Sequence, residues 1–314
     1  MTPQGIGTPV SAVVTAYQRT EKTLATLRRL RACEPPPDEI LVHVDSNQEY
    51  CADAVRLAFP DITVLLSVDS VGPGGGRNKL VAAAKNEFVA SFDDDSYPVD
   101  ADYFERIRAL FNLFPEADVV CGQVNCRGEP AQADLKSAEW VADFLGGACV
   151  FRRERFISTG GYVPLTVAYG MEEVDFALRL HARGGRVLRS GWLRVFHDTD
   201  LAHRAAPAVA AASVANVLLL AYLRYPRTMW WVGAGQCLNL VAWLLRNGRR
   251  RGVARGLLMA PRYIWRNRHH RARLTATTVK TYLALRRAPA PIDFPTSSHF
   301  GGSFATLVPP AGSR

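Results

Sequence analysis

The first hundred residues alternate between apolar runs and amphipathic segments, and this alternation constrains the fold more than any other feature of the sequence. Short runs rich in valine, isoleucine and leucine are typical of buried strands, and leucines at helical spacing indicate helices. The expected strands are residues 10–17, 39–45, 62–68 and 88–93, and between them we expect helices at 19–33 and 51–59 and a glycine-rich loop that runs into a helix at 71–86. This order predicts an α/β fold in which helices cover both faces of a parallel sheet.

Carboxylates follow two of these strands. Asp45 ends the second strand, and the triplet Asp93, Asp94 and Asp95 ends the fourth. Because ligands bind beyond the carboxyl ends of parallel strands, we expect Asp45 and Asp93 to project into one crevice. Residues i and i+2 of an extended chain point the same way. Asp93 and Asp95 are therefore expected to face one site and Asp94 to point elsewhere, so that replacing Asp94 does less harm than replacing either neighbour.

Two convergent carboxylates need a divalent cation, or one of them must stay protonated. Mg²⁺ and Mn²⁺ prefer oxygen ligands and often link a carboxylate to a substrate diphosphate. His197 ends a late strand in "VFHDTD", where it could complete a metal site beside Asp95, although a lone histidine is usually structural. For the triplet itself the alternative is a solvated acidic turn before Pro98.

Three other groups could take part in chemistry. The stretch "GPGGGRN" offers backbone N–H groups and Arg77 to a phosphate, although glycine loops are also common turns. Asp45 could accept a hydrogen bond from N3–H of uracil or thymine, or form an Asx turn. Glu172 and Glu173 begin an expected helix at 172–185, where acidic residues favour the helix dipole. If one of them is a general base, Glu173 is the better candidate, because Glu172 is suited to orienting an acceptor.

The segments "VSAVVTAY", "ILVHVDS", "VGPGGGRN", "FDDDSYP", "GGACVFRR", "GGY" and "GMEEVDFALRLHARG" follow one another in the order and spacing of family 2 glycosyltransferases, which the sequence resembles over about residues 9 to 200. The tract "HDTDLAHR…ANVLLLAYLRYP" also looks like bacterial rhamnosyltransferase-type members, enzymes of cell-envelope polysaccharide synthesis. The resemblance implies a GT-A fold, a UDP- or dTDP-sugar donor, Mg²⁺ or Mn²⁺ as cofactor, and inversion at the sugar carbon.

The same resemblance implies roles for individual residues. Asp95 would be the metal ligand of the DxD motif, with His197 as the later metal-site histidine, and Asp93 would lie near the ribose or phosphate of the donor. Glu173 would be the catalytic base, with Glu172 before it; the family has Asp at the second position, and Glu lengthens its reach. The implied donor-binding residues are Thr15, Ala16, Tyr17, Asp45, Gly75, Arg77, Asn78, Asp93 and Asp94.

Charge divides the chain unevenly. Residues 201–292 hold 16 Lys or Arg and no Asp or Glu, whereas the remainder holds 22 basic and 29 acidic residues. We expect a catalytic domain at 1–204, a basic helical extension at 205–287 and a disordered tail at 288–314. Two uncharged runs, followed by arginines interleaved with aromatics, favour helices that lie on an anionic membrane over spans. A helical subdomain with a solvated basic face is the alternative.

These observations favour an inverting glycosyltransferase whose acceptor is a glycan or a lipid-linked sugar. We expect a cytoplasmic protein, because the N-terminus lacks the pattern of a signal peptide and the six cysteines show no zinc or disulfide spacing. The basic helices would hold it on the inner face of the plasma membrane, and no nucleic-acid partner is expected. Two alternatives are a sugar-phosphate nucleotidylyltransferase, which would need its glycines after the first strand, and a non-enzymatic basic protein that binds membrane or nucleic acid.

Overall fold

The computed structural model describes residues 8–130, 133–165, 171–199 and 206–294. Its first half is the predicted strand–helix alternation, which comprises β1 (Val10–Ala16), α1 (Thr20–Arg31), β2 (Glu39–Val44), α2 (Glu49–Ala58), β3 (Thr63–Leu66), α3 (Gly72–Ala83) and β4 (Phe88–Asp93). Strand β1 pairs in parallel with both β2 and β4, and β2 pairs in parallel with β3. The parallel sheet predicted for this half is therefore confirmed.

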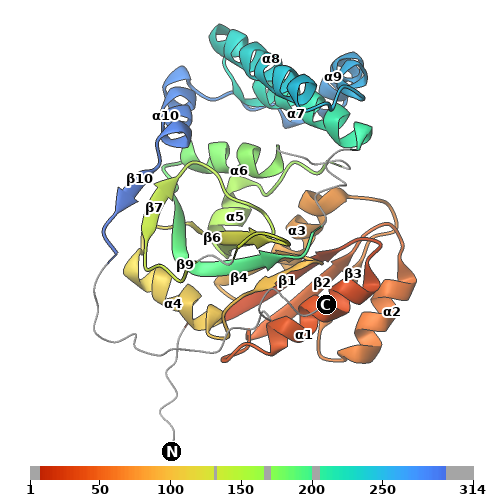
Figure 1. Cartoon of the computed structure of the whole chain (residues 1–314), viewed down its shortest axis with the longest axis vertical. Helices are drawn as coiled ribbons and strands as arrows, with labels where there is room; N and C mark the ends of the chain where they lie inside the picture. Colours follow the sequence, from red (N-terminus) through yellow and green to blue (C-terminus); the bar gives the residue numbers. More distant parts are fainter. Residues whose placement is uncertain (1–7, 131–132, 166–170, 200–205, 295–314) are drawn as a thin grey trace, which may run out of the picture.

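The second half completes a mixed sheet. It contains β5 (Ser96–Pro98), α4 (Tyr103–Leu113), β6 (Val119–Cys126), β7 (Ala138–Val141), β8 (Ala148–Arg152), α5 (Arg153–Thr159), α6 (Glu172–His181) and β9 (Val187–His197). The strand order is β10-β7-β9-β6-β8-β4-β1-β2-β3, where β10 is Ala290–Ile292. Strand β5 pairs with β9, and β8 runs antiparallel to β4. Figure 1 shows β10 and β7 at one end of the sheet and β3 at the other. A central mixed sheet with helices on both faces is the predicted GT-A architecture.

Alternation along the strands sends side chains into two separate cores. On β1, Val10, Ala12 and Val14 join one core and Val13 joins the other, as the two-residue period requires. The first core also contains buried residues of α1, α2 and α4, and the second contains those of α3, α5 and α6. Both faces of the sheet are thus covered, which leaves the ends of the strands as the place for a ligand.

The C-terminal region forms helices, as the sequence predicts. These are α7 (Pro207–Arg224), α8 (Trp230–Arg246), α9 (Val253–Asn267) and α10 (Ala276–Arg287), and α8 is among the outermost elements in Figure 1. Among the described residues, α7 is the one helix long and apolar enough to cross a membrane, but 61% of its apolar window is buried inside the protein.

The first part of the predicted disordered tail, up to Phe294, is structured. Residues Ala290–Ile292 form β10, which pairs antiparallel with β7, and the ring of Phe294 lies against those of Phe114 and Trp192. Pairing with a sheet edge and aromatic contacts hold this segment in place, and neither was visible in its Pro-rich composition. Residues 295–314 lie outside the described part of the chain, so that part of the expectation stays a prediction.

Candidate active site

The carboxyl edge of the parallel strands carries the acidic triplet. Thr15 lies beside Asp93 in the β1–β4 register, and its Oγ1 is 3.5 Å from Asp93 Oδ1. After β4 the chain turns sharply at Asp93–Ser96. Ser96 Oγ fixes this turn, because it accepts from the Asp93 backbone N–H at 2.7 Å and donates to the Gly147 carbonyl at 2.7 Å.

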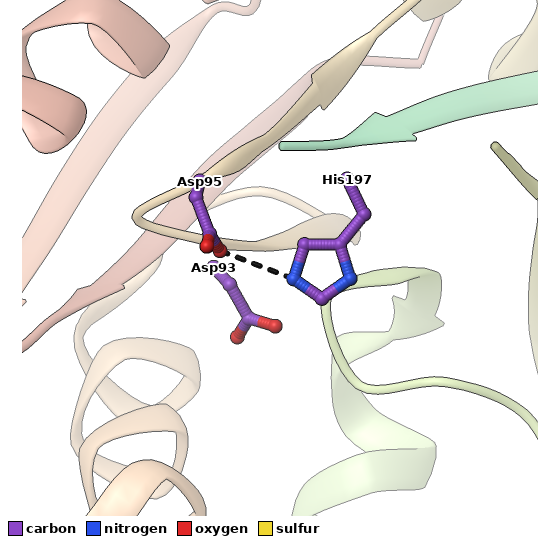
Figure 2. A group of neighbouring side chains, drawn as sticks. All are labelled: Asp93, Asp95 and His197. Carbon is purple, nitrogen blue, oxygen red and sulfur yellow. Dashed lines mark hydrogen bonds and ion pairs between the residues drawn. The ribbon is translucent and has the colours of Figure 1, made fainter. Parts of the chain in front are cut away.

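Asp93, Asp95 and His197 converge at this turn. One ligand atom from each lies within 4.8 Å of the others, and His197 Nε2 is 3.1 Å from Asp95 Oδ1 (Figure 2). The pairing of β5 with β9 places His197 opposite Ser96, next to the triplet. The convergence of Asp93 with Asp95, and of His197 with Asp95, is therefore confirmed, while their roles toward a ligand stay predictions.

The donor set fits a divalent metal ion. Two carboxylates and one imidazole suit Mn²⁺, whereas Mg²⁺ prefers oxygen ligands alone. The 3.1 Å between His197 Nε2 and Asp95 Oδ1 is close to the separation, about 3 Å, of two neighbouring ligands on an ion with bonds of about 2.1 Å. The residues present thus fit a divalent metal ion, the cofactor that the sequence predicts.

Two cations that sequence reasoning missed neutralise these carboxylates. Arg19 forms ion pairs with both Asp94 and Asp95, and Lys22 Nζ is 3.9 Å from Asp95 Oδ2. Burial would raise the pKa of Asp95, but the hydrogen bond with His197 and the charge of Arg19 lower it. The available signal was position, because Arg19 and Lys22 follow β1 directly and so lie at the same edge of the sheet as the triplet.

Asp94 is turned away from the cluster, as predicted, but it is not solvated. Only 1% of it is exposed, and it accepts from the Tyr17 backbone N–H at 3.3 Å as well as from Arg19. Burial raises the pKa of Asp94 to about 7, although the Arg19 charge opposes the shift. Asp94 therefore holds β1 and α1 to the triplet, which is a structural task that alternation alone did not reveal.

A second cluster surrounds Arg77, the basic residue of the glycine stretch. Its guanidinium is ion-paired with Asp93, and its Nε donates to Ser91 Oγ at 3.0 Å. A Cβ on Gly146 would lie 2.9 Å from Glu173 Oε1 and 3.1 Å from Arg77 Cζ, and one on Gly147 would lie 2.3 Å from Asp93 Oδ2. The two glycines after the sequence "DFL" thus leave room for Asp93, Arg77 and Glu173 to meet.

Glu172 and Glu173 begin α6, as predicted, but their environments differ. Glu173 is partly exposed and accepts from the Gly146 backbone N–H at 3.3 Å, whereas Glu172 is 4% exposed and its Oε2 has no hydrogen-bond partner among the described residues. Burial raises the pKa of both carboxyl groups, and the Arg77 charge partly offsets the shift in each. The more accessible Glu173 keeps the better position for a general base.

The glycine-rich stretch is part of helix α3, so the prediction that it forms a loop is wrong. Its predicted contact with phosphate stays a prediction. Helix α3 already begins at Gly72, and Asp45 accepts its first N–H groups, from Val71 at 3.0 Å and Gly72 at 3.1 Å. A Cβ on Gly74 would lie 1.9 Å from Glu172 Oε2. The absence of side chains therefore serves close packing at this position.

Three other predicted donor-binding residues have structural contacts. Gly75 lies where a Cβ would meet Val71 at 2.8 Å, and Asn78 exchanges two hydrogen bonds with the Tyr162 backbone, at 2.8 and 2.9 Å. The Ala16 carbonyl accepts from the Asp45 N–H at 3.1 Å. These contacts hold the ends of β1 and β2 together and fix the position of α3. The predicted contacts of these three residues with a donor stay predictions.

The fold and the site together define the GT-A class of glycosyltransferases. The profile described as "Glycosyltransferase like family 2" matches residues 8–210, which is more than half of the chain. The chain therefore belongs to glycosyltransferase family 2, as the resemblance indicated. The search of the curated proteins found no match.

Solved structures show the same fold at low sequence identity. The mannosyltransferase PcManGT from Pyrobaculum calidifontis, in complex with GDP-Man and Mn²⁺, is 17% identical with a TM-score of 0.56, and 90% of this chain and 87% of that chain are covered. GalNAc-T7 with UDP, GalNAc and Mn²⁺ is 12% identical with a TM-score of 0.55. TarS from S. aureus is 15% identical with a TM-score of 0.50. The matches cover 71% and 74% of this chain, but only 49% of GalNAc-T7 and 43% of TarS.

Proposed function

We propose that this family 2 glycosyltransferase moves a sugar from a UDP- or dTDP-sugar to a hydroxyl group of a glycan, a glycolipid or a polysaccharide precursor, with inversion at the anomeric carbon. The observation that carries the proposal is the meeting of two groups at one edge of the sheet. These are the ligand set of Asp93, Asp95 and His197 and the cluster of Arg77 with Glu173. The solved GT-A structures with UDP or GDP-Man and Mn²⁺ support it by analogy.

Asp95 and His197 would hold a divalent metal ion, for which their donor atoms fit Mn²⁺ best. Such an ion stabilises the negative charge that grows on a diphosphate leaving group. Arg19 forms an ion pair with Asp95, but its side chain is 44% exposed. It can therefore turn toward solvent when a metal ion binds to Asp95. Arg77 is buried and ion-paired with Asp93, which suits this pair to positioning the donor beside the metal ion.

Glu173 would remove the proton from the acceptor hydroxyl. One displacement at the anomeric carbon then forms the new glycosidic bond and breaks the bond to the diphosphate, and this inverts the configuration. Burial raises the pKa of Glu173 and so favours its protonated form, and the nearby Arg77 charge opposes this shift and favours the ionised base. Glu172, behind it and against Gly74, would position rather than react.

The test is turnover of a donor panel. UDP-, dTDP- and GDP-sugars are incubated with the protein, Mn²⁺ and a glycan acceptor mixture, and release of the nucleoside diphosphate is followed together with the anomeric configuration of the product by NMR. We expect release from a UDP- or dTDP-sugar and an inverted product. Turnover of GDP-sugars alone, or a retained configuration, would contradict the proposal. A dTDP-rhamnose response would support the predicted likeness to rhamnosyltransferases.

A further inference from the structure

Helix α8 presents an apolar face to solvent. Trp231, Ala234, Leu238 and Leu245 follow one another at intervals of three, four and seven residues, so they share one side of the helix. All four are exposed, Trp231 by 73% and Leu238 by 69%, and α8 has no charged residue before Arg246. The solvent-facing side of a helix in a water-soluble protein is ordinarily polar. The apolar face of α8 is therefore suited to contact with an apolar partner rather than with water.

Helix α9 repeats the feature and adds charge. Leu258, which is 81% exposed, and Trp265, which is 62% exposed, lie on one face with Pro261 between them. Exposed arginines flank this apolar face at positions 255, 262 and 266. An apolar stripe bordered by arginine and tryptophan is the composition of a helix that lies in a membrane interface.

Three further arginines gather where α8 begins. Desolvation and the positive charges of Arg271 and Arg227 lower the pKa of Arg273. The Arg271 guanidinium lies over the Tyr222 ring at 4.0 Å and over the Trp230 ring at 5.7 Å, so aromatic groups hold it in place. Since residues 201–292 contain no Asp or Glu, no carboxylate of this region neutralises the group. The repulsion among these three arginines would be relieved by an anion that binds from outside the protein.

We propose that the exposed faces of α8 and α9, with the arginines at 227, 271 and 273, dock the protein on an anionic phospholipid bilayer. The apolar stripes would enter the interface and the arginines would contact lipid phosphates. Charge selects this occupant, because a second copy on the same face would bring two sets of arginines together. Nucleic acid would satisfy the arginines but leave the leucines and tryptophans of the stripes in water.

Docking at this face would bring a membrane-bound acceptor to the catalytic residues, a step that rests on the proposed function. Helix α9 has its lipid-facing stripe on one side and Tyr263, half-buried, on the other. Tyr263 packs against the second core, which also contains Val174 and Phe176 of α6, the helix that carries Glu173. The predicted location on the inner face of the plasma membrane agrees with this arrangement.

Vesicle co-sedimentation of the full chain tests the surface. The probes are vesicles of phosphatidylcholine and vesicles with about one third phosphatidylglycerol. The variants are Leu238→Gln with Leu258→Gln for the stripes, and Arg262→Gln with Arg266→Gln for the charge. The matched control is Tyr50→Gln with Leu57→Gln, which replaces two apolar side chains of α2 that are 78% and 86% exposed. Donor turnover without vesicles and thermal melting accompany each variant.

We expect wild type and control to bind the anionic vesicles, each variant pair to lose at least about tenfold in partitioning, and salt to release the protein. Donor turnover should stay within about twofold in the stripe variants, since these side chains face away from the site. Equal sedimentation of stripe variants and control, or binding to a DNA duplex in preference to vesicles, would overturn the proposal that this face docks on a membrane. Vesicle binding without donor turnover would instead count against the proposed function.

Discussion

At the scale of single residues, the surroundings of Glu173 determine the pH range in which it can act as a base. Its carboxyl group lies in the Arg77 cluster, where burial raises its pKa above the ordinary value of a glutamate. A base must be ionised to act, so activity should rise with pH through this raised pKa. The acidic limb of the kcat/KM profile is therefore expected above about pH 4.5.

Replacing Glu173 by Gln should lower kcat by about 10²- to 10⁴-fold, because Gln keeps the shape of the side chain but cannot take a proton. The measurement is kcat and KM across pH 4 to about 8 for both proteins, with far-UV circular dichroism to show that the variant is folded. An acidic limb at or below pH 4.5, or near-wild-type kcat in Glu173→Gln, would rule Glu173 out as the base.

Asp94 is predicted to act on stability. In Asp94→Ala the Tyr17 N–H and the Arg19 guanidinium lose an acceptor, so the free energy of unfolding should fall by about 1–3 kcal/mol. Asp53→Ala is the control, because Asp53 pairs with Arg56 at the surface and its loss should change stability by no more than about 0.5 kcal/mol. Urea titration measures both. Equal values for the two variants would mean that the buried contacts of Asp94 contribute little.

The sequence predicted that Asp93 and Asp95 face one site, but alternation along a strand is not the cause. Strand β4 ends at Asp93, and Asp94 and Asp95 lie in the turn that Ser96 holds. The sequence did not show the contact of Asp94 with Arg19, because Arg19 reaches the triplet only after β1 and β4 have paired. The expected position of His197 beside Asp95 is confirmed, and the pairing of β5 with β9 is what brings them together. Glu172 and Glu173 look alike in sequence, and only the packing of α6 against Gly74 and Gly146 distinguishes them.

At the scale of elements, glycines allow close packing in both α3 and α9. The sequence predicted a phosphate-binding loop before α3, but glycines 74 to 76 lie inside this helix and pack against neighbouring side chains. In α9 a Cβ on Gly256 would lie 2.6 Å from the Ala211 carbonyl oxygen of α7, so these helices cross almost backbone to backbone. Such contacts join residues far apart in sequence, and this is why composition alone predicted a loop.

Gly256→Ala should therefore destabilise the C-terminal helices by about 1–3 kcal/mol, because the added methyl group forces α9 away from α7. The matched variant is Gly235→Ala in α8, where no atom lies within 4 Å of the new Cβ. Ala is the better helix former, so Gly235→Ala should instead raise the free energy of unfolding by about 0.5–1 kcal/mol. Thermal and urea unfolding show the sign of each change; the same sign for both would refute close packing at Gly256.

At the scale of the whole molecule, a buried ion pair ties the C-terminal helices to the catalytic domain. Arg224 of α7 donates from Nε to Asp175 Oδ1 at 2.5 Å, and Asp175 also accepts from Arg179 at 2.9 Å. The sequence predicted these helices but not the ion pair that joins α7 to α6. Because Asp175 stands two residues after Glu173, the proposed membrane surface and the proposed base are linked through α6.

The response of turnover to metal tests the central claim, which is that Asp95 and His197 hold a divalent ion for the donor diphosphate. Donor turnover is measured after EDTA and again after Mn²⁺ is added back, for wild type, Asp95→Asn and Asp198→Asn, a neighbouring carboxylate outside the ligand set. We predict that EDTA lowers wild-type turnover at least about a hundredfold and that Mn²⁺ restores it in wild type and Asp198→Asn but not in Asp95→Asn. Turnover that resists EDTA, or an Asp95→Asn protein that responds to Mn²⁺ like wild type, would contradict the claim.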